Sequence, residues 1–261
     1  MKQAVGVWAA RIDDLDERFE TGLALLSEEE RIRAAGMRPP ASREWALTRC
    51  GLRLLLGHLL GLEPHLILLD APRNRQPQLK TSLWPPEISV SHSGGLAAYA
   101  VASASVRVGV DVERLRPVRA PLRLAKRNFA PAEAEAVASA PARQAAAVFL
   151  ETWTRKEAVA KATGLGLRLP LDSFLVAAPP QLPEVLQAPR TTPLRRWQLL
   201  PLQTPDDYVG TIAIASPRRR FAPEPPSLGV SGAAPSPLFR LELGRSSAAW
   251  GQPPDRAPVR A

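Results

Sequence analysis

The sequence predicts an α/β (α+β) protein with two similar halves, each a small, largely antiparallel sheet packed on a long helix. Three observations lead to this prediction. Two long helical segments each end at a glycine, Gly61 and Gly164. Short strand-like runs follow each segment. The last run of each half closes on a nearly identical tetrapeptide, at 100–103 and at 213–216.

The first half begins with a strand predicted over residues 5–12. Ser27 and Glu30 then have the spacing of a capping box, which predicts the start of a helix that stops before Pro39. The strongest helical pattern covers residues 43–60, where an apolar side faces a side of recurring arginines. Glycine directly after this segment predicts its C-terminal cap.

Strand-like runs then follow in quick succession, which is typical of antiparallel pairing. They cover residues 65–69, 88–93, 96–103 and 106–113. In the second half, helices are predicted over residues 119–128, 131–138 and 144–163. Further strands are predicted over residues 174–177, 196–202 and 208–216.

The predicted domain organisation has an N-terminal lobe at residues 1–105 and a C-terminal lobe at 106–216. Beyond residue 216, prolines and arginines interrupt every periodic pattern. Residues 217–261 are therefore predicted to form a disordered tail, apart from a short apolar island at 238–243.

Composition excludes several classes of protein. The 261 residues include a single cysteine, Cys50, so neither a disulfide framework nor a cysteine zinc site is expected. The N-terminus lacks a signal-peptide pattern, and the most apolar stretch, 52–62, is too short to cross a membrane, so we expect a cytoplasmic protein with no membrane partner. The net charge of +9 suits an acidic or phosphorylated partner. Without an aromatic-rich basic ribbon, nucleic acid is not expected.

Asp111 and Glu113 lie two apart in a predicted strand, so both carboxylates point to one face while Val110 and Val112 point to the core. Adjacent carboxylates repel each other unless a cation lies between them, and hard oxygen ligands at this spacing suit Mg²⁺. The alternative is a strand edge with solvated acids.

Glu157 and Lys161 lie four apart and share a face of the predicted helix. An exposed ion pair is the commonest reason for this spacing. Phe149 and Trp153 lie on the same face, however, which therefore runs from the core to a charged site. The chain otherwise uses mainly arginine, so Lys156 and Lys161 in one helix indicate a need for a compact ammonium, with chance as the alternative.

His92 ends a predicted strand next to Gly94 and Gly95, where the backbone can approach a ligand closely. A surface or core histidine is the alternative. A serine-hydrolase interpretation of Ser91 and His92 fails, because adjacent strand residues point to opposite faces.

In combination, these motifs resemble the 4′-phosphopantetheinyl transferases, in particular the larger, monomeric, two-lobed (Sfp-type) group. The resemblance rests on S-H-S-G at 91–94, G-V-D-V-E at 109–113 and W-x-x-K-E-A-x-x-K at 153–161. It covers roughly residues 5–216. Phe129 and Glu133 also fit the F-x-x-x-E spacing of the family.

The resemblance implies two lobes related by a pseudo-twofold axis, with the ligand between them. It implies transfer of 4′-phosphopantetheine from coenzyme A to a serine of an apo acyl or peptidyl carrier protein, with release of 3′,5′-ADP. Asp111, Glu113 and Glu157 would hold Mg²⁺. Glu157 would act as the base, directly or through a metal-bound water, and Lys161 would neutralise charge on the diphosphate and the leaving group. Coenzyme A would be contacted by His92, Arg43, Arg49, Arg75 and Lys161.

Two departures from the family pattern concern the coenzyme A cleft. The G-K-P motif is Arg75-Gln76-Pro77 here, so Arg73 or Arg75 would substitute for its lysine, and the F-N motif is Ile88-Ser89. Two other functions stay open. One is a different Mg²⁺-dependent phosphoryl enzyme such as a phosphohydrolase, and the other is an inactive homologue that binds coenzyme A or a carrier protein without turnover.

Overall fold

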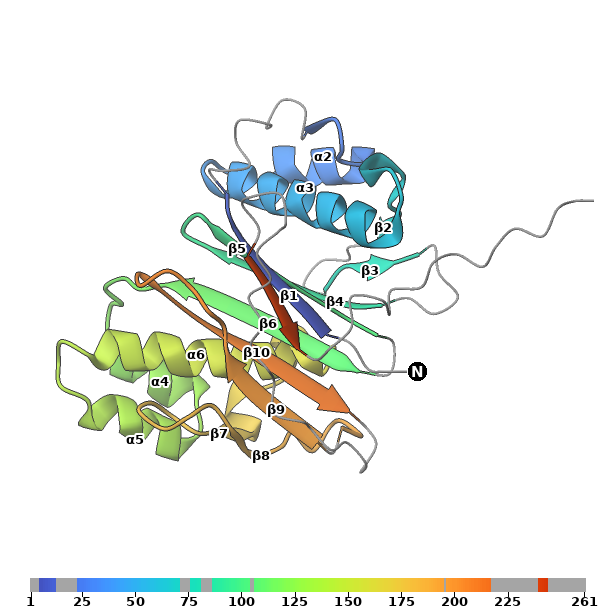
Figure 1. Ribbon diagram of the computed structural model, residues 1–261. Coiled ribbons are helices and arrows are strands. Elements are labelled where there is room, and N and C mark those ends of the chain that lie inside the picture. Colours follow the sequence, from blue (N-terminus) through green and yellow to red (C-terminus); the bar gives the residue numbers. More distant parts are fainter. Residues whose placement is uncertain are drawn as a thin grey trace, which may run out of the picture.

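The computed structural model describes residues 5–12, 23–70, 76–80, 86–103, 106–194, 196–216 and 239–243. It confirms a mixed α/β structure with small antiparallel sheets (Figure 1). The two main sheets have four and three strands, and two shorter strand pairs accompany them.

The first sheet has the strand order β11-β1-β5-β4 and is antiparallel throughout. Its strands are β1 (Val5–Arg11), β4 (Glu87–Ser93), β5 (Leu96–Ala102) and β11 (Phe239–Leu243). β4 and β5 form the expected hairpin, which turns at Gly94 and Gly95, both with positive φ. β11 falls on the predicted apolar island, and the remaining residues of the predicted tail lie outside the described residues.

Helix α3 (Ala41–Leu60) covers one face of this sheet (Figure 1). Its leucines pack in a buried cluster with Trp8 of β1 and Tyr99 of β5. The helix ends at Gly61 in the left-handed conformation, at φ 65°, as predicted. Helix α2 (Glu28–Ala35) packs on α3 and begins with the predicted capping box at Ser27.

The strand predicted over residues 65–69 is wrong. Pro64–Leu66 form a 3-10 turn, η2, and only Leu69–Asp70 form a strand, β2, which pairs with β3 (Gln78–Leu79). Proline at the first position favours a helical turn. Of this apolar run, Ile67 is fully buried, whereas Leu66 and Leu68 are exposed, so the side chain of Ile67 anchors the segment in the core.

The second sheet has the order β6-β10-β9, also antiparallel, with β6 (Arg107–Arg114), β9 (Arg196–Pro201) and β10 (Tyr208–Ser216). Thus β6 does not continue the β4–β5 meander but pairs with a strand almost one hundred residues later. Helix α6 (Ala145–Ala162) packs on this sheet, and α4 (Pro121–Asn128) and α5 (Pro131–Ser139) pack beside it (Figure 1).

Short elements follow α6: η3 (Gly166–Arg168), η4 (Leu171–Ser173), β7 (Leu175–Val176) and β8 (Val185–Gln187). The sequence did not predict β8. Its last two residues are both exposed, so it lacks the alternation by which a half-buried strand is found.

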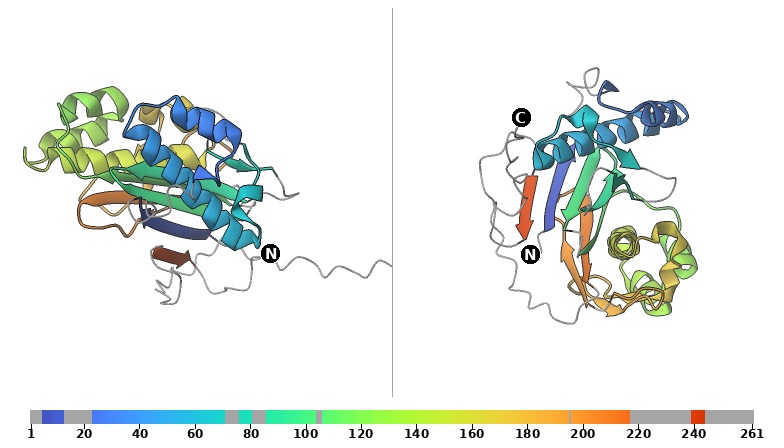
Figure 2. Two further views of the ribbon diagram at one scale, coloured as in Figure 1. Left: turned by 90° about the horizontal axis from the view of Figure 1, so that it is seen from above. Right: turned by 90° about the vertical axis from the view of Figure 1, so that its right-hand side faces the viewer.

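Side chains that face away from α3 and α6 form one buried cluster shared by both sheets. It includes Val7 and Ala98 from the first sheet and Val110, Val112 and Ile212 from the second. The layers therefore run from α3 through the two sheets to α6 (Figures 1 and 2).

The two similar tetrapeptides, at 100–103 and 213–216, lie at the ends of β5 and β10, which are inner strands of their sheets. In the part of the chain described above, no helix combines the length and the apolarity that a membrane span needs.

Candidate active site

Strand β6 presents its two carboxylates to the side of the sheet that faces α6. Asp111 is 5% exposed and Glu113 is half-buried. Val110 and Val112 point the other way, into the cluster between the sheets. The predicted alternation along this strand is therefore confirmed.

Gly109 lets helix α6 lie directly against β6. A Cβ atom at this position would stand 2.0 Å from the carbonyl oxygen of Ala158 and 2.7 Å from the amide nitrogen of Ala162. Both distances are far below van der Waals contact, so only glycine permits this approach. The contact brings Glu157 and Lys161, in the last turns of α6, next to Asp111.

Lys161 joins helix and strand. Its ammonium nitrogen donates to Asp111 Oδ1 at 2.8 Å and to the carbonyl of Val110 at 2.9 Å. Glu157 lies one turn earlier and is 7% exposed. One of its oxygens, Oε1, and Asp111 Oδ2 are buried without a hydrogen-bond partner among the described residues.

These acids are electrostatically coupled. Burial is the main reason that the pKa of Glu157 is raised, and the negative charges of Asp111 and Glu113 add to the effect, while Lys161 opposes it. Burial likewise raises the pKa of Glu113, with Asp111 adding to it against a hydrogen bond from Ser93. One lysine thus does not offset three carboxylates, and a further cation would relieve their repulsion.

The site fits a hard divalent cation by its chemistry, although its side chains are not gathered around one point. Among the described residues, no group of three or more His, Cys, Asp or Glu side chains is arranged to hold a metal ion as it stands. The two buried oxygens without partners, on Asp111 and Glu157, are the observation that favours a cation here, because orphaned buried acceptors are costly.

Strand β4 contributes contacts that the sequence reasoning missed. Ser91 donates to Asp111 Oδ1 and Ser93 donates to Glu113 Oε2, each at 2.7 Å. The spacing of Ser91 and Ser93, two apart in a strand like the two acids, does predict that both hydroxyls share one face. The spacing does not predict their partners, because the sequence does not show that β4 and β6 are neighbours.

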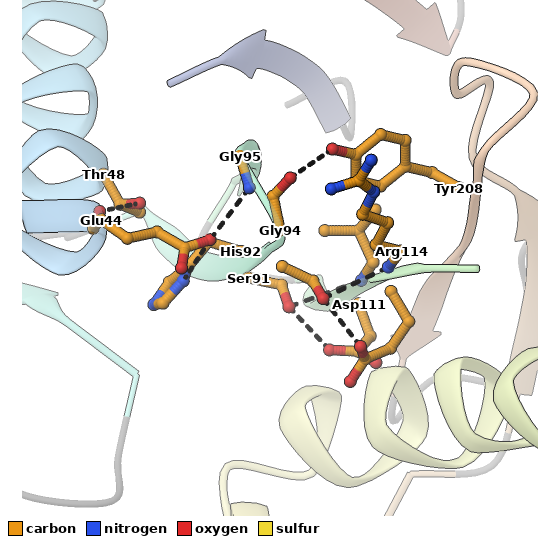
Figure 3. Close-up of polar contacts among 12 residues, drawn as sticks. Glu44, Thr48, Ser91, His92, Gly94, Gly95, Asp111, Arg114 and Tyr208 are labelled. Atoms are coloured by element: carbon orange, nitrogen blue, oxygen red, sulfur yellow. Dashed lines mark hydrogen bonds and ion pairs between the residues drawn. The ribbon is translucent and has the colours of Figure 1, made fainter. Parts of the chain in front are cut away.

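His92 points to the opposite side of β4, as predicted from its position between the two serines. Its Nδ1 lies 3.4 Å from Glu44 Oε1 on the first turn of α3. The same oxygen accepts a hydrogen bond from the backbone N–H of Gly95 at 3.2 Å (Figure 3). The contact with His92 is the main reason that the pKa of Glu44 is lowered, and the hydrogen bond from Gly95 adds to the effect. Sequence reasoning had assigned no role to Glu44.

The turn after His92 also touches the second half of the chain. Tyr208, at the start of β10, donates its hydroxyl to the carbonyl oxygen of Gly94 (Figure 3). A Cβ at Gly94 would lie 2.7 Å from the side chain of Arg114 on β6. The glycine turn therefore contacts both halves of the chain.

Two of the predicted arginines, Arg43 and Arg49, belong to α3 and lie apart from the carboxylates. Arg43 is exposed on the first turn of α3. Arg49 is 8% exposed, and burial lowers its pKa. Its Nε lies 3.4 Å from Oε1 of Glu30, and its guanidinium stacks on the ring of Trp45. Arg75 lies outside the described residues. Gln76, which replaces the family's lysine, accepts a hydrogen bond from the N–H of Val90 on β4 at 2.7 Å.

Lys156 lies away from the site. It is fully buried and pairs with Glu133, which is 1% exposed, and it donates to the carbonyl of Phe174. Glu133 also accepts from the backbone N–H groups of Ala130 and Val176. The spacing of Phe129 and Glu133 therefore reflects a buried structural cluster.

Comparison with known proteins identifies the family of this chain. Residues 107–213, which hold all three acids and Lys161, match the family described as the 4′-phosphopantetheinyl transferase superfamily. The chain is 34% identical over 218 residues to the 4′-phosphopantetheinyl transferase HetI of Nostoc sp., a match that covers 82% of this chain and 89% of that protein.

Two Bacillus subtilis proteins are also similar. A 4′-phosphopantetheinyl transferase is 32% identical over 133 residues, which is 48% of this chain and 57% of that protein. The 4′-phosphopantetheinyl transferase Sfp is 35% identical over 88 residues, 34% of this chain and 38% of Sfp.

Proposed function

This chain belongs to the 4′-phosphopantetheinyl transferase superfamily, and from that premise we propose that it modifies a serine of an apo acyl or peptidyl carrier protein. The donor would be coenzyme A and the second product 3′,5′-ADP. The observation that supports this best is that Lys161 contacts Asp111 while Glu157 lies near enough to feel the charges of Asp111, Glu113 and Lys161. Such a site suits a diphosphate and the charge that develops when it is cleaved.

We propose that Asp111, Glu113 and Glu157 hold Mg²⁺. Their oxygens are the ligands that this ion prefers, and the unpartnered oxygens of Asp111 and Glu157 are available to it. When bound, the ion would neutralise the carboxylates and the coenzyme A diphosphate. Lys161 already supplies one positive charge at the same place.

The residues of the chain can then be given roles in the transfer. Glu157 would accept the proton of the carrier serine as the general base. The serine oxygen would form a bond to the phosphorus that carries pantetheine. The bond from that phosphorus to the 3′,5′-ADP oxygen would break, and Lys161 would offset the charge left on the leaving phosphate.

We propose that His92, Arg43, Arg49 and Arg75 contact the other phosphates of coenzyme A. His92 lies beside the Gly94–Gly95 turn, and its imidazole faces α3, which carries Arg43. Arg49 has one buried guanidinium nitrogen, Nη1, without a partner among the described residues. Glu44 would hold the imidazole of His92 in place.

We propose that residues 1–105 and 106–216 are lobes related by a pseudo-twofold axis, in a cytoplasmic monomer. In support, each main sheet packs on one long helix, and each helix is followed by a glycine with positive φ, Gly61 and Gly164. Residues 217–261 would add nothing to the chemistry.

The deciding experiment is mass spectrometry of an apo carrier protein incubated with this protein, coenzyme A and Mg²⁺. The expected result is a carrier that gains one phosphopantetheine arm and equimolar 3′,5′-ADP. The Asp111→Ala variant, once circular dichroism has shown that it is folded, should give neither product. Excess EDTA should stop the reaction, and full transfer in EDTA would overturn the Mg²⁺ proposal.

The same experiment separates the alternatives. Cleavage of coenzyme A with no change in the mass of any carrier would identify a phosphohydrolase. Binding of coenzyme A without product would identify an inactive homologue. Either result would overturn the proposed transferase reaction.

A further inference from the structure

Strands β4 and β6 lie side by side, although they belong to different sheets and exchange no ladder hydrogen bonds. Serine hydroxyls bridge the gap. Backbone N–H groups of β6 donate to hydroxyl oxygens of β4 in the pairs Val110–Ser89, Val112–Ser91 and Arg114–Ser93, at 3.0, 3.4 and 3.2 Å. Every second residue of both strands takes part, so the two strands run parallel along this serine seam.

Two of the three serines make a second contact. Ser91 donates its proton to Asp111 and Ser93 donates its proton to Glu113, as described above. A hydroxyl has one hydrogen and two lone pairs, so each serine can accept from β6 and donate to it at once. At the corresponding place beside Ser89, β6 carries Gly109, which has no side chain. Ser89 therefore belongs to the seam but has no carboxylate to hold.

We propose that Ser91 and Ser93 are positioning residues that orient the two strand carboxylates toward the ion, an inference that rests on the proposed function. Ser91 and Lys161 both engage Oδ1 of Asp111, and Oδ2 is the oxygen left without a partner. Ser93 and Arg116 likewise both engage Oε2 of Glu113. One oxygen of each carboxylate is thereby fixed, and the torsion that would swing the carboxylate away from the ion is restricted.

The S-H-S motif therefore makes contacts on both faces of strand β4. His92 faces α3, where Glu44 lies, whereas Ser91 faces Asp111 of β6 (Figure 3). Ser93 contacts Glu113 of β6 in the same way. The strand therefore couples the histidine on one side to the acid pair on the other.

The test measures the affinity of the full chain for Mn²⁺, a probe for Mg²⁺, in the absence of coenzyme A. Calorimetry, or electron paramagnetic resonance of the free ion, gives this affinity. Ser91→Ala and Ser93→Ala are compared with the wild type and with Ser89→Ala. Loss of a hydrogen bond that orients a metal ligand typically weakens binding about 10–100-fold. We expect that loss for the first two variants and less than about a twofold change for Ser89→Ala.

Activity gives a second readout that a purely structural role would not move. For Ser93→Ala, the Mg²⁺ concentration for half-maximal transfer should rise about tenfold or more, while kcat at saturating Mg²⁺ approaches the wild-type value. Ser93→Thr keeps the hydroxyl and should restore Mn²⁺ binding. Position 93 is half-buried, so these variants are expected to fold, and thermal unfolding in EDTA checks this.

The outcomes are distinct. If the wild type binds Mn²⁺ and Ser91→Ala, Ser93→Ala and Ser89→Ala all bind it equally well, the positioning role is wrong while the metal site stands. If the folded wild type binds no Mn²⁺ at all, the metal site itself is wrong, and the inference falls with it. Weaker binding by Ser93→Ala that Ser93→Thr does not reverse would also overturn the role of the hydroxyl.

Discussion

At the scale of single residues, Lys156 and Lys161 show how partners decide the role of a side chain. Both lie in α6, five residues apart. Lys156 is fully buried, its pKa is lowered by burial, and it pairs with Glu133 in a structural cluster. Lys161 remains partly exposed and holds Asp111. The W-x-x-K-E-A-x-x-K motif thus contains one lysine for the fold and one for the site.

Glu157→Gln should lower kcat of transfer by about 10²-fold or more, the range typical for loss of a general base. The metal-free protein should unfold at the same temperature or a higher one, because the raised pKa of Glu157 means that its charge is unfavourable in the fold. Thermal unfolding in EDTA beside transfer kinetics measures both. Glu135→Gln, at an exposed position of α5, is the control. A Glu157→Gln variant that is less stable but fully active would make this helix face structural.

Glu44→Gln should raise KM for coenzyme A more than it lowers kcat. The amide can still accept from Gly95, but it removes the negative charge beside His92. We expect a rise of about 3–10-fold, equivalent to roughly 1 kcal/mol of binding free energy. Glu28→Gln, an exposed acid of α2 that pairs with Arg31, is the control. An unchanged KM would show that Glu44 does not position His92 for the ligand.

The same variant should change the pH dependence of stability. The folded-state pKa of Glu44 is lowered, so its contacts stabilise the fold at pH values above its ordinary pKa. This contribution is lost as the pH falls through the lowered pKa. Thermal unfolding between neutral and acid pH should therefore show a smaller loss of stability for Glu44→Gln than for the wild type. Parallel curves for the two proteins would contradict the expectation.

At the scale of elements, the site depends on how closely α6 approaches β6. The glycine of the G-V-D-V-E motif is explained by this packing, since its missing Cβ is where the helix backbone lies. Thr154 of α6 also contacts Thr211 of β10 at 3.1 Å, which fixes the helix across the sheet. Two acids on a strand and one on a helix become a single site only through this contact.

Gly109→Ala should separate helix and strand, because its Cβ would lie 2.0 Å from the carbonyl of Ala158. We expect a loss of about 1–3 kcal/mol in the free energy of unfolding, with a larger proportional loss of transfer activity. Denaturant unfolding and transfer kinetics measure the two. Gly36→Ala is the matched control, since its Cβ would meet only ordinary contacts at 3.6 Å. Equal behaviour of the two variants would mean that close packing at β6 is not required.

At the scale of the whole molecule, the two sheets are joined by a shared apolar cluster, by the serine seam and by the contact of Tyr208 with Gly94. Helix α3 carries Glu44 on one side of this junction, and α6 carries Glu157 on the other. β11 pairs with β1 at the outer edge of the first sheet, on the side away from β4. The far C-terminal segment therefore extends the sheet at a distance from the serine seam.

Removal of residues 217–261 should leave kcat and KM of transfer nearly unchanged, because the seam and the carboxylates do not involve β11. The truncated chain should aggregate more readily, since an uncovered β1 edge exposes unpaired backbone groups. Kinetics and light scattering measure the two effects. A large loss of activity in monomeric, folded protein would show that the tail contributes to the cleft or to carrier binding.

Much of the fold could be predicted because its signals are local. The capping box of α2, the glycine that ends α3 and the bounds of β10 depend on a few neighbouring residues. The failures have local causes too. The apolar composition of residues 65–69 predicts a strand, whereas the proline before them favours the 3-10 turn that forms. The sequence does not predict strand β8, because its exposed residues show no alternation of apolar and polar side chains.

Local patterns predict the alternation that places Asp111 and Glu113 on one face, the helix face shared by Glu157 and Lys161, and the family that these motifs resemble. The pairing of β6 with β10, the contacts of Ser91 and Ser93 with the carboxylates, and the contact of Glu44 with His92 are known only from the folded structure. The difference lies in the sequence separation of the residues involved. Periodicity records which way a side chain points within its own element, whereas the partner that it meets depends on packing between elements far apart in the chain.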